Sequence, residues 1–209
     1  MSYLYNVLSE SFNERLETKQ LVLRPYEEGD ESDFMRVMLE NGALLNPAFG
    51  NRLARVKVLD DARTQMRQLR TDWENRKVFD FGVWLKEDKT YIGDITLKNL
   101  DYKIPKAELG LYFTEWPATR SLALQAMQEV VVFGFRNLSL QKIYLRCTEA
   151  NAILGALALE AGFQLEGTLR SDYRGATTNE LLDLSYYGIT LPDFEQLQQL
   201  KEAKSKVLA

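Results

Sequence analysis

The chain has 209 residues, with apolar and charged fractions of 45% and 27% and a formal net charge of −4 at pH 7. This length gives one domain, with appendages at most, and is enough to bury a full core. The negative charge argues against general nucleic-acid binding, which needs a basic face for the phosphates. The single cysteine, Cys147, excludes a disulfide framework and favours a reducing compartment.

The chain contains no histidine. This removes Ser-His-Asp and Cys-His nucleophile chemistry, together with the commonest transition-metal ligand, and we expect no metal. Proton transfer must then use Glu, Asp, Tyr, Lys, Cys, a backbone terminus or water. The N-terminal stretch MSYLYNVLSESFNERLE does not resemble a signal peptide, and no segment approaches the length of a membrane span. We therefore expect a cytoplasmic protein without nucleic-acid or membrane partners.

The first half of the chain reads as an arm, two helices and three strands. Leu4, Leu8 and Phe12 have helical spacing, so residues 1–16 should form an N-terminal arm that docks on the body or on another subunit. Strands are predicted at residues 20–24, 79–86 and 91–100, and helices at 30–40 and 60–76, with a loop at 41–58 between them.

The stretch from Glu108 to Phe135 is the centre of the chain. It reads as a strand at 108–113, a break with Trp116 and Pro117, and a long helix with one narrow polar stripe. Such a helix should be largely buried. A strand that leads through a tight loop into a buried helix directs free backbone N–H groups at the gap above the sheet. That arrangement predicts a site for a phosphate or carboxylate.

The remaining segments complete a mixed sheet. A strand at 142–148 precedes a helix at 150–161, where Gly162 is expected as a left-handed cap. Strands at 163–170 and 180–189 and a helix at 191–209 follow. The order predicts an α+β (mixed α/β) fold with helices on both faces of the sheet. We place its domain at residues 17–190, between the arm and the C-terminal helix.

Six phrases occur in a characteristic order: ETKQLVLRPYEEGD, YIGDITL, ELGLYF, KIYLRCTEAN, EAGFQLEGTLR and the closing Gly175…Asp183…Tyr187. Together they resemble the GCN5-related N-acetyltransferase (GNAT) superfamily, and most of all its bacterial enzymes that acetylate the N-termini of ribosomal proteins. The resemblance covers about residues 17–190. It implies a mostly antiparallel sheet of about seven strands, splayed between the fourth and fifth strands, with acetyl-CoA as co-substrate in that cleft.

The resemblance also implies which residues hold the co-substrate. The pantetheine arm would pair with the backbone of Leu111, Tyr112 and Phe113. A loop of pattern Gln/Arg-x-x-Gly-x-Gly/Ala would wrap the pyrophosphate, because glycines let the backbone approach the phosphates at a helix N-terminus. The matching residues of this chain are Ala118, Thr119, Arg120, Ser121, Leu122 and Ala123.

This loop departs from the family pattern. Ala118 stands at the first polar position and Ser121 at the glycine, while Arg120 and two hydroxyl groups remain to hold an anion. Before the last helix, Asn151 matches the Asn of the family's Asn-x-x-Ser, and Leu154 replaces the Ser. Asn151 is therefore included among the expected co-substrate contacts.

Catalytic candidates follow from the same resemblance. Glu108 is placed where related enzymes often have a carboxylate that relays the substrate's ammonium proton; the alternative is an edge-strand salt bridge. Glu166 matches a carboxylate considered catalytic in the ribosomal branch; the alternative is a structural hydrogen bond. The tyrosine that often protonates the CoA thiolate falls at Ala158, which leaves Tyr112 or Tyr173 to approach the cleft.

Two functions are consistent with these residues. The first is an N-acetyltransferase that acts on a protein N-terminus or a small amine by direct attack in a ternary complex. The second is a GNAT-fold binding or assembly module whose CoA site has degenerated. The sequence does not identify the acceptor amine, and it leaves open whether the chain forms a homodimer.

Overall fold

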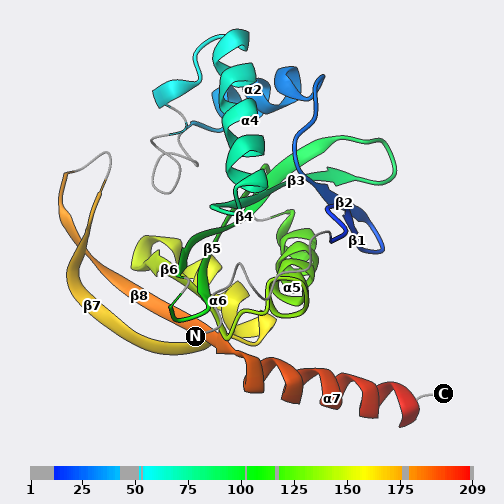
Figure 1. Ribbon diagram of the computed structural model, residues 1–209. Helices are drawn as coiled ribbons and strands as arrows, with labels where there is room; N and C mark the ends of the chain where they lie inside the picture. Colours follow the sequence, from blue (N-terminus) through cyan, green and yellow to red (C-terminus); the bar gives the residue numbers. More distant parts are fainter. Residues whose placement is uncertain are drawn as a thin grey trace.

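The computed structural model describes residues 12–42, 52, 54–101, 103–115, 118–175 and 179–207, with side chains up to residue 203. They form one eight-stranded sheet in the order β1-β2-β3-β4-β5-β6-β8-β7 (Figure 1). All neighbouring strands are antiparallel except β5 and β6. The predicted mixed fold is confirmed, and the additional strand is the short β1.

The elements lie close to their predicted ranges. Strand β5 begins two residues earlier than expected, and β7 runs further because its hairpin with β8 continues through two register shifts. The strands are β1 (Leu16–Glu17), β2 (Leu21–Arg24), β3 (Phe79–Leu85), β4 (Tyr91–Asp101), β5 (Lys106–Phe113), β6 (Lys142–Thr148), β7 (Gln164–Arg174) and β8 (Leu181–Thr190). The helices are α2 (Glu31–Glu40), α4 (Leu59–Glu74), α5 (Arg120–Arg136), the 3-10 turn η1 (Glu149–Asn151), α6 (Ala152–Ala161) and α7 (Leu191–Val207).

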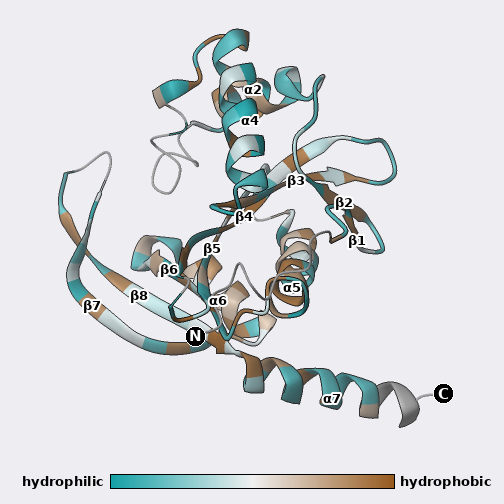
Figure 2. Cartoon of the chain, in the orientation of Figure 1, coloured by the Kyte–Doolittle hydropathy of each residue, from teal (hydrophilic) through white to brown (hydrophobic). Residues whose placement is uncertain are grey.

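Helices cover both faces of the sheet, as the sequence predicted (Figure 1). The side chains of β3 point to both faces of the sheet. Phe79 and Phe81 belong to the core cluster under α5, whereas Trp84 belongs to the cluster under α2 and α4. In Figure 2 the strands beneath the helices are largely brown, while much of α4 is teal. Gly162 ends α6 with a left-handed φ of 99°, as expected for that cap.

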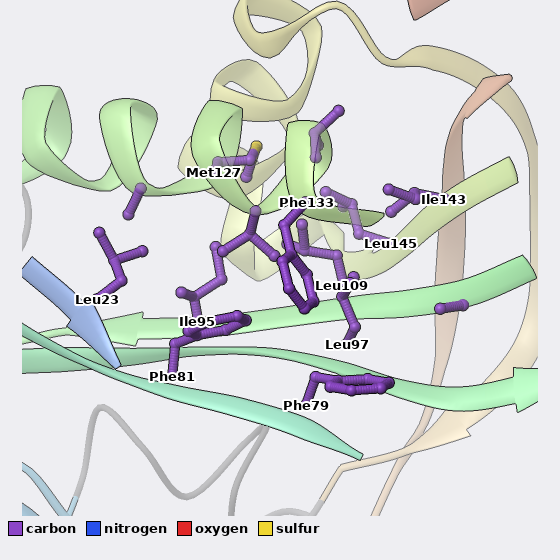
Figure 3. Packing of buried hydrophobic residues seen from close by; sticks show 14 of the residues in the cluster. Leu23, Phe79, Phe81, Ile95, Leu97, Leu109, Met127, Phe133, Ile143 and Leu145 are labelled. Atoms are coloured by element: carbon purple, nitrogen blue, oxygen red, sulfur yellow. The ribbon is translucent and has the colours of Figure 1, made fainter. Parts of the chain in front are cut away.

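Helix α5 forms the centre of the larger cluster. Phe133 is 1% exposed and meets the rings of Phe79 and Phe81 at centroid distances of 5.7 and 5.1 Å (Figure 3). The apolar pattern of the helices and of the residue after Gly162 predicts nine core residues, and among them only Leu122 is half-buried, because it lies in the first turn of α5 at the helix end. The buried ones are Met66, Leu69, Trp73, Met127, Val130, Phe133, Leu157 and Phe163.

The two chain ends attach differently to this body. Phe12 packs against Trp73 and Phe133, and Glu14 accepts a hydrogen bond of 3.0 Å from the Trp73 indole. The end of the predicted arm therefore docks on the body, while residues 1–11 lie outside the described part. At the other end, Phe194 stacks on Phe135 at 4.9 Å, and α7 then projects away from the sheet (Figure 1).

Truncation of Phe133 tests the central position of α5. Phe133→Ala should lower the free energy of unfolding by about 3–5 kcal/mol, because it opens a large cavity in a packed layer. Urea denaturation measures this change, with Leu200→Ala on the exposed part of α7 as the control. A loss below about 1 kcal/mol for Phe133→Ala would show that the ring is not packed in this way.

Docking of the arm is tested by Phe12→Ala combined with Glu14→Ala. Loss of the aromatic contacts and of the hydrogen bond to Trp73 should cost about 1–2 kcal/mol, or about 2–8 °C in melting temperature. Arg15→Ala, in the same segment but with an exposed side chain, is the matched control and should leave the melting temperature unchanged. If the wild type, the double variant and Arg15→Ala all melted at the same temperature, the result would contradict docking of the arm.

Candidate active site

The two parallel strands at the centre of the sheet separate along their length. Strands β5 and β6 pair only through Lys106 with Lys142, Ala107 with Ile143 and Glu108 with Tyr144. Both strands continue beyond this ladder, each paired on its outer edge with β4 or β8. Their facing edges therefore carry backbone groups that can pair with an extended ligand. This is the divergence predicted between the fourth and fifth strands, which are the fifth and sixth strands, β5 and β6, when β1 is counted.

The expected pantetheine contacts lie on the β5 side of this divergence. Leu111 and Phe113 face the cluster under α5, and Leu111 is only partly buried. Tyr112 points to the opposite face and belongs to the cluster under α2 and α4. An extended ligand could therefore pair with the backbone of these residues while only the odd-numbered side chains touch the α5 side.

Helix α5 follows β5 and begins at Arg120 without a side-chain cap. The Thr119 hydroxyl is turned away, because it donates a hydrogen bond of 2.8 Å to the Thr114 carbonyl. The first N–H groups of the helix therefore keep the capacity to bind an anion. Around them, Ala118 and Ser121 are exposed, whereas Ala123 is completely buried.

Arg120, the first residue of α5, is held by an ion pair. Its Nη2 lies 2.5 Å from Oε2 of Glu160 in the last turn of α6, and the two side chains are 37% and 46% exposed. Asn151, which is expected to contact the co-substrate from α6, lies exposed at the start of that helix and makes no side-chain cap bond. Sequence analysis did not identify Glu160, because nothing local predicts a contact across 40 residues.

Glu108 occupies the last paired position before the strands diverge. Its side chain is 7% exposed, and Arg146 Nη2 lies 2.9 and 3.1 Å from its two carboxylate oxygens. Asn99 donates a further hydrogen bond of 2.7 Å, and Lys98 Nζ lies 3.9 Å away. The geometry is thus that of a salt bridge, and a catalytic role for Glu108 stays a prediction. Arg146 was not identified from the sequence, although strand alternation and parallel pairing together place it here.

Glu166 lies away from this position. Its carboxylate pairs with Lys142 Nζ at 2.6 Å and is 37% exposed. Lys142 and Arg146 are four residues apart on β6, which separates their Cα atoms by about 13 Å. The structure therefore does not bring Glu108 and Glu166 together, and Glu166 stands beside the paired beginning of β6.

Tyr112 belongs to a buried chain of hydroxyl groups. Its OH lies 2.6 Å from that of Tyr91, which lies 2.9 Å from that of Tyr26. The Tyr26 hydroxyl in turn donates to the Asp94 carboxylate. Burial, followed by the charge of Asp94, raises the pKa of Tyr112 above its ordinary value. A direct role of Tyr112 at the cleft stays a prediction, since its hydroxyl lies on the α2 and α4 side.

The series of hydroxyl groups ends at Asp94, which shares the guanidinium of Arg52 with a second buried carboxylate, Asp80. Arg52 donates to Asp94 at 3.1 Å and to Asp80 at 3.0 Å, and its side chain is 11% exposed. Burial and the neighbouring charge of Asp80 raise the pKa of Asp94 well above its ordinary value. The Arg52 cation therefore offsets the cost of two carboxylates with almost no access to water.

Tyr187 on β8 and Cys147 on β6 lie on the face of the sheet that α6 covers. A side chain added at Gly155 would meet the Tyr187 hydroxyl at 2.7 Å and the Cys147 sulfur at 3.6 Å. Burial raises the pKa of both Tyr187 and Cys147. This agrees with a packing role for Cys147. Tyr187 stays protonated at neutral pH and lies beside Gly155, three residues before the buried Ala158 at which the family tyrosine was expected.

No group of three or more Cys, Asp or Glu side chains in the described residues could hold a metal ion. No helix in the same part of the chain is long and apolar enough to cross a membrane.

Comparisons with known proteins agree on one family. A family model described as "Acetyltransferase (GNAT) domain" matches residues 20–164. The chain is 25% identical over 178 residues to the uncharacterized N-acetyltransferase YoaA of Bacillus subtilis, covering 85% of this chain and 97% of that protein.

Solved structures share the fold at low sequence identity. The ribosomal L7/L12 α-N-protein acetyltransferase RimL, in complex with coenzyme A, matches with a TM-score of 0.76 and 16% identity. The ribosomal-protein-S5-alanine acetyltransferase of Vibrio fischeri matches with a TM-score of 0.76 and 14% identity. Each alignment covers 87% of this chain and 99% of the other.

Removal of the buried cation tests the Arg52 cluster. Arg52→Met should destabilise the protein by about 3–5 kcal/mol, because two buried carboxylates lose their shared partner. Arg55→Met, an exposed arginine three residues away, is the control and should cost less than about 0.5 kcal/mol. Chemical denaturation of both variants measures the difference, and equal stabilities would show that Arg52 does not hold the two carboxylates.

Proposed function

The chain belongs to the GNAT acetyltransferase family, and we propose that it transfers an acetyl group from acetyl-CoA to a primary amine by direct attack in a ternary complex. The observation that carries this proposal is the ladder between β5 and β6, which ends at Glu108 and Tyr144 although both strands continue. An interrupted parallel pair followed by an uncapped helix start offers an edge for amide groups and N–H groups for phosphates.

The donor would lie along β5. Its pantetheine amides pair with the backbone of Leu111–Phe113, and its pyrophosphate reaches the start of α5, with Asn151 on the other side. A backbone N–H of β5 beside the thioester would stabilise the oxyanion that forms at the carbonyl. Fixing donor and amine side by side converts a bimolecular encounter into an oriented attack.

Proton transfer on the acceptor side would run through Glu108. The ammonium group must lose a proton before its nitrogen can attack the carbonyl carbon. Because both oxygens of Glu108 already accept hydrogen bonds, a water molecule would pass the proton toward this carboxylate. As the carbon–sulfur bond breaks, the CoA thiolate takes up a proton from water or from a hydroxyl such as that of Tyr187.

A protein N-terminus is the acceptor we favour over a small amine. Two structures with this fold are named as acetyltransferases of ribosomal proteins, one acting on an α-amino group. The direct test is mass spectrometry of peptides incubated with the protein and acetyl-CoA. Acetylation at the free α-amine, but not of the same peptide with a blocked N-terminus, is the expected result.

A non-catalytic binding module is the second candidate. It is favoured by the loop at the start of α5, where Ala118 offers no polar side chain and Ser121 replaces a glycine. Failure of wild-type protein to bind acetyl-CoA or to modify any amine would support this reading and contradict the first.

Restoring the family loop tests how far it limits donor binding. A lost charge-assisted hydrogen bond costs about 1.5–3 kcal/mol, and a weakened helix-terminus interaction about 0.3–1 kcal/mol. Ala118→Arg, Thr119→Gly and Ser121→Gly together should therefore tighten acetyl-CoA binding at least about tenfold in calorimetry.

The double variant Ala118→Arg and Ser121→Gly restores the two positions that depart from the family pattern and keeps the hydrogen bond from Thr119 to Thr114, so it should show most of the same gain. Tight binding by the wild type, with no gain in either variant, would show that the loop does not limit affinity.

A further inference from the structure

The ion pair between Arg120 and Glu160 joins the two helices that follow the diverging strands. Helix α5 follows β5 and begins with Arg120; α6 follows β6 and carries Glu160 in its last turn. The guanidinium and the carboxylate lie 2.5 Å apart. In the described part of the chain, the Arg120 guanidinium has no other hydrogen bond or ion pair.

The carboxylate of Glu160 is an anion bound by Arg120, as a phosphate group of the donor would be at the same place. Guanidinium groups recognise carboxylates and phosphates through the same hydrogen-bond geometry. A diphosphate at the start of α5 would therefore compete with Glu160 for Arg120. Glu160 would also remain nearby as a charge of the same sign, which opposes the incoming anion.

We propose that Glu160 is a specificity-determining residue that lowers the affinity of the cleft for the diphosphate portion of the donor. The inference rests on the proposed function, because it assumes that the donor's diphosphate reaches the start of α5. Its consequence is selective: donors that carry the diphosphate lose affinity, whereas the pantetheine portion alone does not meet Arg120 or Glu160.

Calorimetry with two probes, coenzyme A and pantetheine, separates these effects. Glu160→Gln removes the charge and frees Arg120, so it should bind coenzyme A about fivefold more tightly than the wild type. Its affinity for pantetheine, which has no phosphate, should be unchanged. Adding Arg120→Gln to Glu160→Gln should abolish the gain for coenzyme A.

Glu74→Gln is the matched control. It removes the same charge from an exposed helical ion pair, with Arg70 on α4, and leaves α5 and α6 untouched. This variant should bind both probes as the wild type does. Because Glu160 is 46% exposed, its substitution should not impair folding, and a melting curve of each variant checks this.

Three results would overturn the inference. Equal tightening for both probes would show that Glu160→Gln opens the cleft in general and does not relieve competition. Unchanged coenzyme A affinity in Glu160→Gln, with measurable wild-type binding, would remove the role of Glu160 and leave the proposed function standing. Absence of coenzyme A binding in wild type and variant alike would overturn both.

Discussion

Three residue pairs of parallel ladder between β5 and β6 hold the two parts of the sheet together. Strands β1 to β5 lie on one side of this ladder, and β6, β8 and β7 lie on the other. A longer ladder would close the gap between the strands, and a shorter one would leave the two parts joined by helices alone. The position at which the ladder ends therefore determines where an extended ligand can enter the sheet.

Helix α5 compensates for the short ladder. At Gly134, an added side chain would come within 2.7 Å of Ile143 on β6 and 3.4 Å of Leu97 on β4, so α5 packs closely over both parts. Phe133 next to it meets the aromatic residues of β3. The apolar burial of one helix thus stabilises a sheet whose central hydrogen bonding is interrupted, and the start of that helix is fixed beside the gap.

The sequence was sufficient for the elements but not for the contacts that define the site. Periodicity located α5 and most strands because each signal lies within one segment, and the resemblance added the divergence of the central strands. The Glu108–Arg146 and Arg120–Glu160 pairs join residues 38 and 40 positions apart, so they depend on register and helix placement that no local pattern encodes. The sharing of Arg52 by Asp80 and Asp94 was missed for the same reason.

The salt bridge at Glu108 constrains any mechanism at this cleft. Glu108 on β5 and Arg146 on β6 connect the two parts of the sheet at the level where the ladder ends. A full proton transfer to Glu108 would remove the charge that the Arg146 guanidinium binds and would weaken this connection between the two strands. In the proposed mechanism, a water molecule hydrogen-bonded to Glu108 would therefore be the first to receive the ammonium proton. The charge that would position this water is the same charge that binds Arg146 on the neighbouring strand.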